Sequence, residues 1–237
     1  MLLLIMILIY IKKYLGISHF VTLQKYLWLY VCLLYYMEGK LLRYDVIKNI
    51  LQTSNNSPVI SNLGPTSDEL WHITKELELL PRERNFYTYG SMGLCSSIAL
   101  GIAINTNEKV VSIDGDGSLL MNLGTLSTIG RVSPDNLIIV ACDNEMWAQT
   151  GYQPTATAFN TELENVSKFC GFKNTFKCTN IDEFKNIFEN ALKIKGPTMI
   201  VAKTKETGEF PEVTPVEPEF TTYRFRNSML NNNEAKL

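Results

Sequence analysis

The stretch that most constrains the fold is a short, unbroken apolar run at residues 137–141, with the sequence Leu-Ile-Ile-Val-Ala. A strand with one solvent-exposed face alternates apolar and polar residues, whereas a strand covered on both faces is apolar throughout. The run therefore predicts a central strand with helices packed on both sides. Further strands are expected at 59–61, 86–88, 109–113, 175–177 and 198–202.

Helical patterns lie between these strands. Apolar residues recur at helical spacing over 40–52, and Ser67 is expected to cap a helix over 68–79 that Pro81 ends. Because strand and helix alternate, we expect an α/β fold, a doubly wound and mainly parallel sheet flanked by helices. The remaining helices are expected at 94–104, 119–129, 161–170 and 182–194.

Composition narrows the functional class. The chain has 237 residues, of which 46% are hydrophobic, so a full core can form. A formal net charge of -2 gives no reason to expect nucleic acid or an anionic membrane as a partner. The five cysteines form no CxxC pair, which indicates reduced thiols and a cytoplasmic protein. With only two histidines, a Ser-His-Asp triad or a His-rich metal site is not expected.

The two ends of the chain differ from the middle. Residues 1–36 hold two apolar runs, neither of which reaches the roughly 18 residues of a membrane span. Three interpretations of this extension are open: a weak membrane anchor, an extra packing helix, or an upstream segment with Met37 as the natural start, which we favour. Residues 37–215 are expected to form the working domain, and the proline-rich, non-periodic segment 216–237 to be a C-terminal tail.

Two motifs follow neighbouring predicted strands. Gly115-Asp116-Gly117 follows the strand at 109–113, and Asn144 lies one strand–helix–strand step later, after the strand at 137–141. Ligands of open parallel sheets bind at the carboxyl ends of strands, so both motifs should meet at one edge. A carboxylate and an amide oxygen are hard ligands that suit Mg²⁺.

The same loop suits a phosphate. Gly115 and Gly117 let the backbone approach closely, and the helix expected after Ser118 directs its free N–H groups at an anion. The sequence therefore predicts one divalent cation with a diphosphate beneath it.

With these motifs, the chain resembles thiamine-diphosphate enzymes, whose signature looks like Gly115-Asp116-Gly117 with Asn144. More narrowly, residues 85–155 are similar to sulfopyruvate and phosphonopyruvate decarboxylases. The part resembled is the diphosphate-binding domain, which is a separate β subunit in sulfopyruvate decarboxylase. The matching stretches are Asn85-Phe86-Tyr87, Gly90-Ser91-Met92-Gly93-Leu94 with Ser96-Ser97-Ile98, 115–130, and Asp143-Asn144 with Thr150-Gly151.

The resemblance implies a role for each matched residue. Asp116 and Asn144 would bind Mg²⁺ through their side chains and Met146 through its carbonyl. The diphosphate would be held by Gly115, Gly117 and Ser118.

The loop at 90–93 would hold the other end of the cofactor. By the resemblance, Gly90 accepts a hydrogen bond from the aminopyrimidine, with Ser91 beside it. Met92 would be the apolar wedge against which the cofactor bends.

The resemblance also implies a reaction and a partner. The expected activity is that of a carboxy-lyase, a decarboxylase of a small anionic 2-oxoacid such as sulfopyruvate or phosphonopyruvate, with thiamine diphosphate and Mg²⁺ as cofactors. The glutamate that activates the cofactor in this family has no counterpart here, because the segment before Phe86 is too short for a pyrimidine domain. We therefore expect a pyrimidine-domain (α) subunit as partner in a hetero-oligomer.

Two alternatives stay open. One keeps the cofactor in a 2-oxoacid oxidoreductase or a carboligase, although the chain has no cysteine cluster for iron–sulfur centres and no flavin domain. The other is a non-catalytic, cofactor-binding regulatory subunit.

Several side chains near these motifs have two possible roles. Glu145 is expected either to face the substrate or to be exposed, and Trp147 either to line the substrate mouth or to contact the partner. The cationic residues near the C-terminus are expected to be solvated surface: Lys203, Lys205, Arg224 and Arg226.

Overall fold

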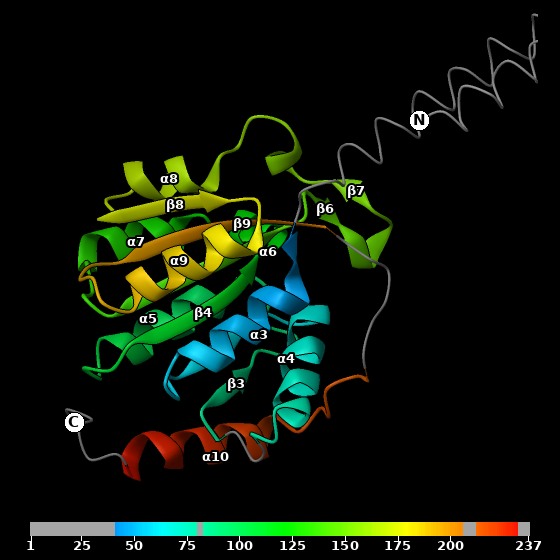
Figure 1. Ribbon diagram of the computed structural model, residues 1–237, viewed down its shortest axis with the longest axis vertical. Coiled ribbons are helices and arrows are strands. Elements are labelled where there is room, and N and C mark those ends of the chain that lie inside the picture. The colour runs from blue at the N-terminus through cyan, green and yellow to red at the C-terminus, as the bar shows by residue number, and fades with distance from the viewer. Residues whose placement is uncertain (1–40, 80–82, 206–211, 232–237) are drawn as a thin grey trace, which may run out of the picture. The chain divides into compact units, whose positions relative to one another are not determined.

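A seven-stranded sheet forms the centre of the protein (Figure 1). The computed structural model describes residues 41–79, 83–205 and 212–231, so the expectations for residues 1–36 lie outside the described residues. Strands run in the order β1-β9-β5-β4-β2-β3, with β8 also beside β9, and every pairing in this sheet is parallel. Their bounds are β1 Leu41–Leu42, β2 Val59–Ser61, β3 Asn85–Tyr87, β4 Val110–Gly115, β5 Leu137–Asp143, β8 Asn174–Cys178 and β9 Thr198–Lys205.

Helices cover both faces of the sheet, which confirms the predicted doubly wound α/β fold. Residues on successive positions of β5 point to opposite faces, so Ile138 and Val140 belong to one core and Ile139 and Ala141 to the other. One face is covered by α3 (Arg43–Thr53), α4 (Pro65–Glu76) and α9 (Ile181–Ala191). The other is covered by α5 (Cys95–Ala103), α6 (Asp116–Met121), α7 (Gly124–Val132) and α8 (Leu163–Phe169).

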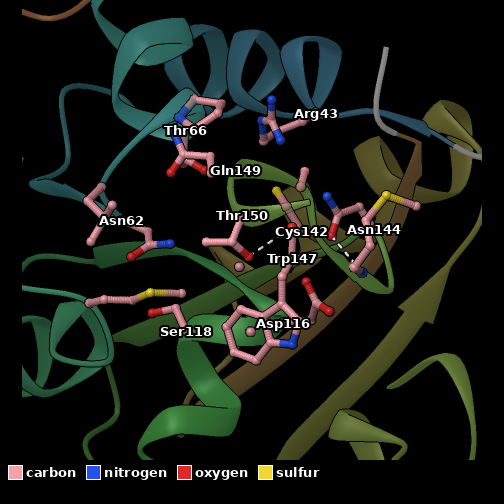
Figure 2. Close-up of a pocket in the computed structure, with 17 residues that line it drawn as sticks. Arg43, Asn62, Thr66, Asp116, Ser118, Cys142, Asn144, Trp147, Gln149 and Thr150 are labelled. Atoms are coloured by element: carbon pink, nitrogen blue, oxygen red, sulfur yellow. Dashed lines mark hydrogen bonds between the residues drawn. The ribbon is translucent and has the colours of Figure 1, made fainter. Parts of the chain in front are cut away.

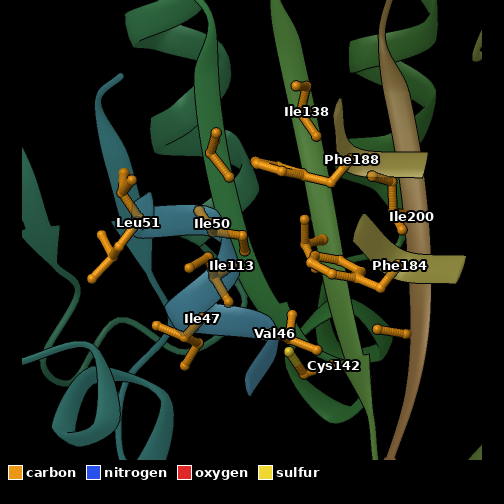
Figure 3. Packing of buried hydrophobic residues seen from close by; sticks show 14 of the residues in the cluster. Val46, Ile47, Ile50, Leu51, Ile113, Ile138, Cys142, Phe184, Phe188 and Ile200 are labelled. Carbon is orange, nitrogen blue, oxygen red and sulfur yellow. The ribbon is translucent and has the colours of Figure 1, made fainter. Parts of the chain in front are cut away.

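The first core holds α3 against the strands that carry the predicted site (Figure 3). Val46 and Ile50 from α3 and Phe184 and Phe188 from α9 are fully buried against the sheet. The two phenylalanine rings stack with centroids 5.7 Å apart. This packing fixes the carboxyl ends of β4 and β5.

The structure corrects two helix expectations. Ser67 does not cap α4, which begins at Pro65 after Gly64; its buried hydroxyl instead donates to the carbonyl of Asn62 at 2.7 Å. The helix expected over 119–129 is two helices, because the chain leaves helical geometry at Asn122, whose side chain donates to the Gly93 carbonyl at 3.0 Å.

The segment 216–237 also differs from the expected tail, because it contains helix α10 (Pro218–Asn231). Phe225 packs edge-on against Phe86 of the edge strand β3, with ring centroids 5.4 Å apart. The buried stripe of α10 consists of Thr221, Phe225 and Ser228. Two of these three residues are polar, which is why the sequence shows no apolar periodicity there.

A second, two-stranded sheet lies in the loop after β5. It pairs β6 (Met146–Trp147) with β7 (Gln153–Pro154), joined by the short helix η1 (Ala148–Thr150), and η2 (Ala156–Ala158) follows. No described helix has the length and apolar character needed to cross a membrane.

Candidate functional site

The loops after β2, β4 and β5 meet in one pocket at the carboxyl edge of the main sheet (Figure 2). Most of the residues predicted from the sequence line it: Met92, Gly115, Asp116, Gly117, Ser118, Asn144 and Met146. Gly90 and Ser91 are not among the lining residues; Gly90 is exposed and Ser91 half-buried. The metal and diphosphate residues therefore come together, and the aminopyrimidine end of the predicted site reaches the pocket through Met92.

Asp116 is a buried carboxylate at the first position of α6, with 2% of its surface exposed. Its Oδ2 accepts hydrogen bonds from Oγ1 of Thr155 at 2.6 Å and of Thr157 at 3.1 Å. Burial raises the pKa of Asp116 to about 6; the Thr155 hydrogen bond opposes this shift and the charge of Asp143 adds to it. In the part of the chain that the structure describes, no cationic side chain forms an ion pair with Asp116.

Asn144 and Met146 lie on the loop after β5. The Met146 N–H donates to Oδ1 of Asn144 at 3.2 Å, which turns the loop back on itself. Between them, Glu145 has a φ of 63°, a left-handed conformation that few non-glycine residues adopt. This turn brings both predicted metal ligands to the pocket wall.

A hydrogen-bond chain joins the loop at 90–93 to the loop after β4. The Gly93 N–H donates to Oγ of Ser118 at 3.1 Å, and Ser118 donates to Oδ1 of Asp114 at 3.0 Å. Asp114 also accepts from Ser112 at 3.1 Å and from Ser96. Burial raises the pKa of Asp114, and the three serine hydroxyls oppose that shift.

Trp147 lies in the pocket wall, one of the two positions expected from the sequence. Its indole lies beside Asp116 and Ser118, directly against Gly117 (Figure 2). The carboxamide of Gln149 lies equally close to Gly64, at the start of α4. Residues 146–150 therefore form one wall of the pocket.

A buried ion pair forms another part of the wall. Arg43 of α3 lines the pocket and binds Glu69 of α4 through Nε and Nη2, both at 2.9 Å. Cys142, which directly precedes the Asp143-Asn144 pair, also lines this wall.

Two cationic side chains that were expected to be solvated make specific contacts instead. Lys203 was expected to be solvated, but its side chain is 11% exposed and its Nζ lies 2.7 Å from Asp143 and 2.5 Å from Glu145. Arg224 likewise donates to the Asn85 carbonyl at 2.9 Å. For Lys203 a signal existed, because its position near the end of the last predicted strand puts it at the same edge as Asp143.

Comparison with known proteins shows the family. Residues 69–202 match the family described as thiamine pyrophosphate enzyme, C-terminal TPP binding domain. A thiamine diphosphate-dependent 4-hydroxybenzoylformate decarboxylase from Rhodococcus jostii RHA1 superposes with a TM-score of 0.59 at 15% identity, covering 72% of this chain and 34% of that one. That likeness concerns the fold alone. The fold and the family match define the class: a thiamine-diphosphate-binding domain.

Closer relatives narrow the class. The sulfopyruvate decarboxylase subunit beta of Methanocaldococcus jannaschii is 44% identical over 188 residues, which cover 79% of this chain and 96% of that protein. The phosphonopyruvate decarboxylase of Streptomyces viridochromogenes is 33% identical, over 71% of this chain and 42% of its own length. The chain belongs to the thiamine pyrophosphate enzymes and, among them, to the family of sulfopyruvate decarboxylase β subunits.

The site residues fit the cofactor of this family. A divalent cation needs hard oxygen donors, and Asp116 offers a buried carboxylate that the described residues leave without a cationic partner. The described residues hold no cluster of three or more His, Cys, Asp or Glu side chains that could bind a metal by itself. A cation at Asp116 would therefore need donors of other kinds, such as an amide oxygen, a backbone carbonyl or phosphate oxygens.

Proposed function

We propose that this chain is the β subunit of a thiamine-diphosphate-dependent decarboxylase that removes CO₂ from sulfopyruvate or phosphonopyruvate. The names of its relatives give the activity and the two candidate substrates. The observation that carries the proposal is that the buried carboxylate of Asp116 lines one pocket together with Asn144 and Met146, where the family's cofactor would need its metal.

Each pocket residue would then have a task. Asp116 and Asn144 would bind Mg²⁺ by their side chains and Met146 by its carbonyl, while Gly115, Gly117 and Ser118 would hold the diphosphate. Met92, which lines the same pocket, would give the cofactor an apolar surface to bend against. The chemistry supplied by thiamine diphosphate when bound is an electron sink for the electron pair left behind as CO₂ departs.

The chain itself contributes positioning and exclusion of water. The hydrogen bonds from Ser118 to Asp114 and from Gly93 to Ser118 tie the diphosphate loop to the Met92 loop. Trp147 and Gln149 would cover the diphosphate end, where a lower local dielectric strengthens every ion contact.

We further propose that the site is completed by a pyrimidine-domain chain carrying the activating glutamate, and that the complex works in the cytoplasm. The relatives' designation as subunit beta supports a partner. The thiols of Cys95, Cys142, Cys170 and Cys178 are free, as is usual in a reducing compartment.

The test uses the chain co-expressed with the pyrimidine-domain chain of the same organism. Binding of thiamine diphosphate is measured calorimetrically with Mg²⁺ and with EDTA, and CO₂ release is followed from sulfopyruvate, phosphonopyruvate and pyruvate. We expect Mg²⁺-dependent binding and turnover of one of the two acids with an anionic tail.

Three outcomes would contradict parts of this proposal. Binding that ignores Mg²⁺ would reject the metal assignment. Turnover that requires an electron acceptor would favour an oxidoreductase. Full activity of the chain without any second subunit would reject the partner.

A further inference from the structure

The ammonium group of Lys203 lies between two carboxylates of the loop that carries the proposed metal ligands. Lys203 on β9 pairs in register with Asp143 on β5. Its Nζ lies 2.7 Å from Oδ2 of Asp143 and 2.5 Å from Oε1 of Glu145. The side chains of Asp143 and Glu145 are only 3% and 12% exposed, so these ion pairs are largely screened from water.

These two carboxylates flank Asn144 in sequence. Asp143 is the last residue of β5, and Glu145 is the left-handed residue that turns the chain from Asn144 to Met146. A non-glycine residue holds such a conformation only where its surroundings impose it. The Lys203 ion pair fixes the Glu145 side chain, and the Thr155 N–H fixes its carbonyl at 3.0 Å.

Asp143 also connects the Lys203 ammonium group to Asp116, the other proposed side-chain ligand. Its Oδ1 accepts from Oγ1 of Thr157 at 2.8 Å, and that hydroxyl lies 3.1 Å from Oδ2 of Asp116. Lys203 therefore touches none of the proposed ligands but contacts the residues that orient them. Second-layer contacts of this kind set metal affinity in proteins.

We propose that Lys203 is a positioning residue for the metal, whose ammonium group holds Asp143 and Glu145 so that Asn144 and Met146 face the cation. The inference rests on the proposed function, since it concerns the same Mg²⁺ site. Without the ammonium group, two buried carboxylates would repel each other and the turn at Glu145 would relax.

The test compares Lys203→Met and Lys203→Arg with the unchanged protein, each in complex with its partner subunit. Thiamine diphosphate binding is followed by quenching of tryptophan fluorescence, to which Trp147 in the pocket wall contributes, while Mg²⁺ is titrated. We expect Lys203→Met to raise the Mg²⁺ midpoint about 10- to 100-fold. At saturating Mg²⁺, affinity for the cofactor should return close to that of the unchanged protein, and Lys203→Arg should recover most of the loss.

The matched control is Lys177→Met on the neighbouring strand β8. Lys177 forms ion pairs with Glu162 and Glu164 at 3.7 and 3.3 Å, and its own side chain is 41% exposed, so the same substitution should leave the Mg²⁺ midpoint unchanged. An unchanged or lower midpoint in Lys203→Met would overturn the inference. So would a loss of cofactor affinity that saturating Mg²⁺ does not restore, since that result indicates a general structural role. Failure of the unchanged complex to bind Mg²⁺ and thiamine diphosphate would instead reject the proposed function.

Discussion

The indole ring of Trp147 lies against Gly117 with no room for a side chain between them. A Cβ at position 117 would come within 2.7 Å of Cε3 and 2.9 Å of Cη2 of the ring. Gly117, the second glycine of the Gly-Asp-Gly motif, thus has two reasons to lack a side chain: the predicted approach of a phosphate and this contact with the pocket wall.

Gly117→Ala should displace the indole of Trp147, lower the stability of the domain and weaken cofactor binding. We expect a loss of about 1–3 kcal/mol in the free energy of unfolding, together with weaker binding of thiamine diphosphate in calorimetry. Adding Trp147→Ala should restore much of the lost stability, because the two changes share one contact. Gly124→Ala is the control, since a Cβ there meets no atom within 4 Å. Equal effects of the two glycine substitutions would argue against the contact.

Ser118→Ala should loosen the connection between the two cofactor loops. The hydroxyl accepts from Gly93 and donates to Asp114, so its removal leaves a buried N–H and a buried carboxylate each short of one partner. We expect thiamine diphosphate affinity to fall about 5- to 30-fold in calorimetry, corresponding to roughly 1–2 kcal/mol.

Asp114→Asn should also lower the affinity for thiamine diphosphate, although Asp114 does not itself line the pocket. Ser97→Ala serves as the control, because Ser97 bonds to Thr125 at 2.8 Å, away from the pocket. Unchanged affinity in Asp114→Asn would show that Ser118 acts on the diphosphate alone.

Breaking the buried pair between Arg43 and Glu69 should destabilise the domain. Arg43→Met leaves the Glu69 carboxylate buried without its bidentate partner, at a cost of about 3–5 kcal/mol in urea unfolding. The double change Arg43→Met with Glu69→Leu should regain most of this loss. Lys48→Met, which removes a solvent-exposed pair with Glu76, should cost far less stability than Arg43→Met. A loss in the double variant equal to that in Arg43→Met would show that uncompensated charge is not the cause.

The thiol of Cys178 should titrate far above neutrality. Burial, with a smaller effect from the charge of Glu183, raises its pKa from 9.0 to about 12. Since the folded-state pKa is the higher one, this thiol's contribution to stability is complete below pH 9 and is lost as the pH rises towards 12. Alkylation at pH 8, followed by mass spectrometry, should label the partly exposed Cys170 and spare Cys178, whose thiolate fraction is on the order of 10⁻⁴. Equal labelling of both would contradict the burial of Cys178.

The strands and the ligand-bearing loops were predictable because their signals are local. The apolar run at 137–141 specified a strand covered on both faces, and strand–helix alternation specified a parallel sheet. These two features are enough to predict that Asp116 and Asn144 lie at the same carboxyl edge of the sheet.

Other parts of the fold were not predictable. Helix α10 buries Thr221 and Ser228 beside Phe225, a stripe without an apolar pattern. The small sheet of β6 and β7 has strands of two residues each, too short to show a period.

Local sequence patterns were enough to predict the fold class and the oxygen donors proposed as ligands between Gly115 and Asn144. The contacts that hold these proposed ligands in place depend on the three-dimensional fold. Thr155 and Thr157 are residue types common on any surface, and nothing in their immediate sequence marks them, while Lys203 is marked only by its place at the end of a predicted strand. They meet Asp116 and Asp143 because sheet register and the fold of the 145–157 loop bring distant segments together, and such contacts follow from packing rather than from local pattern.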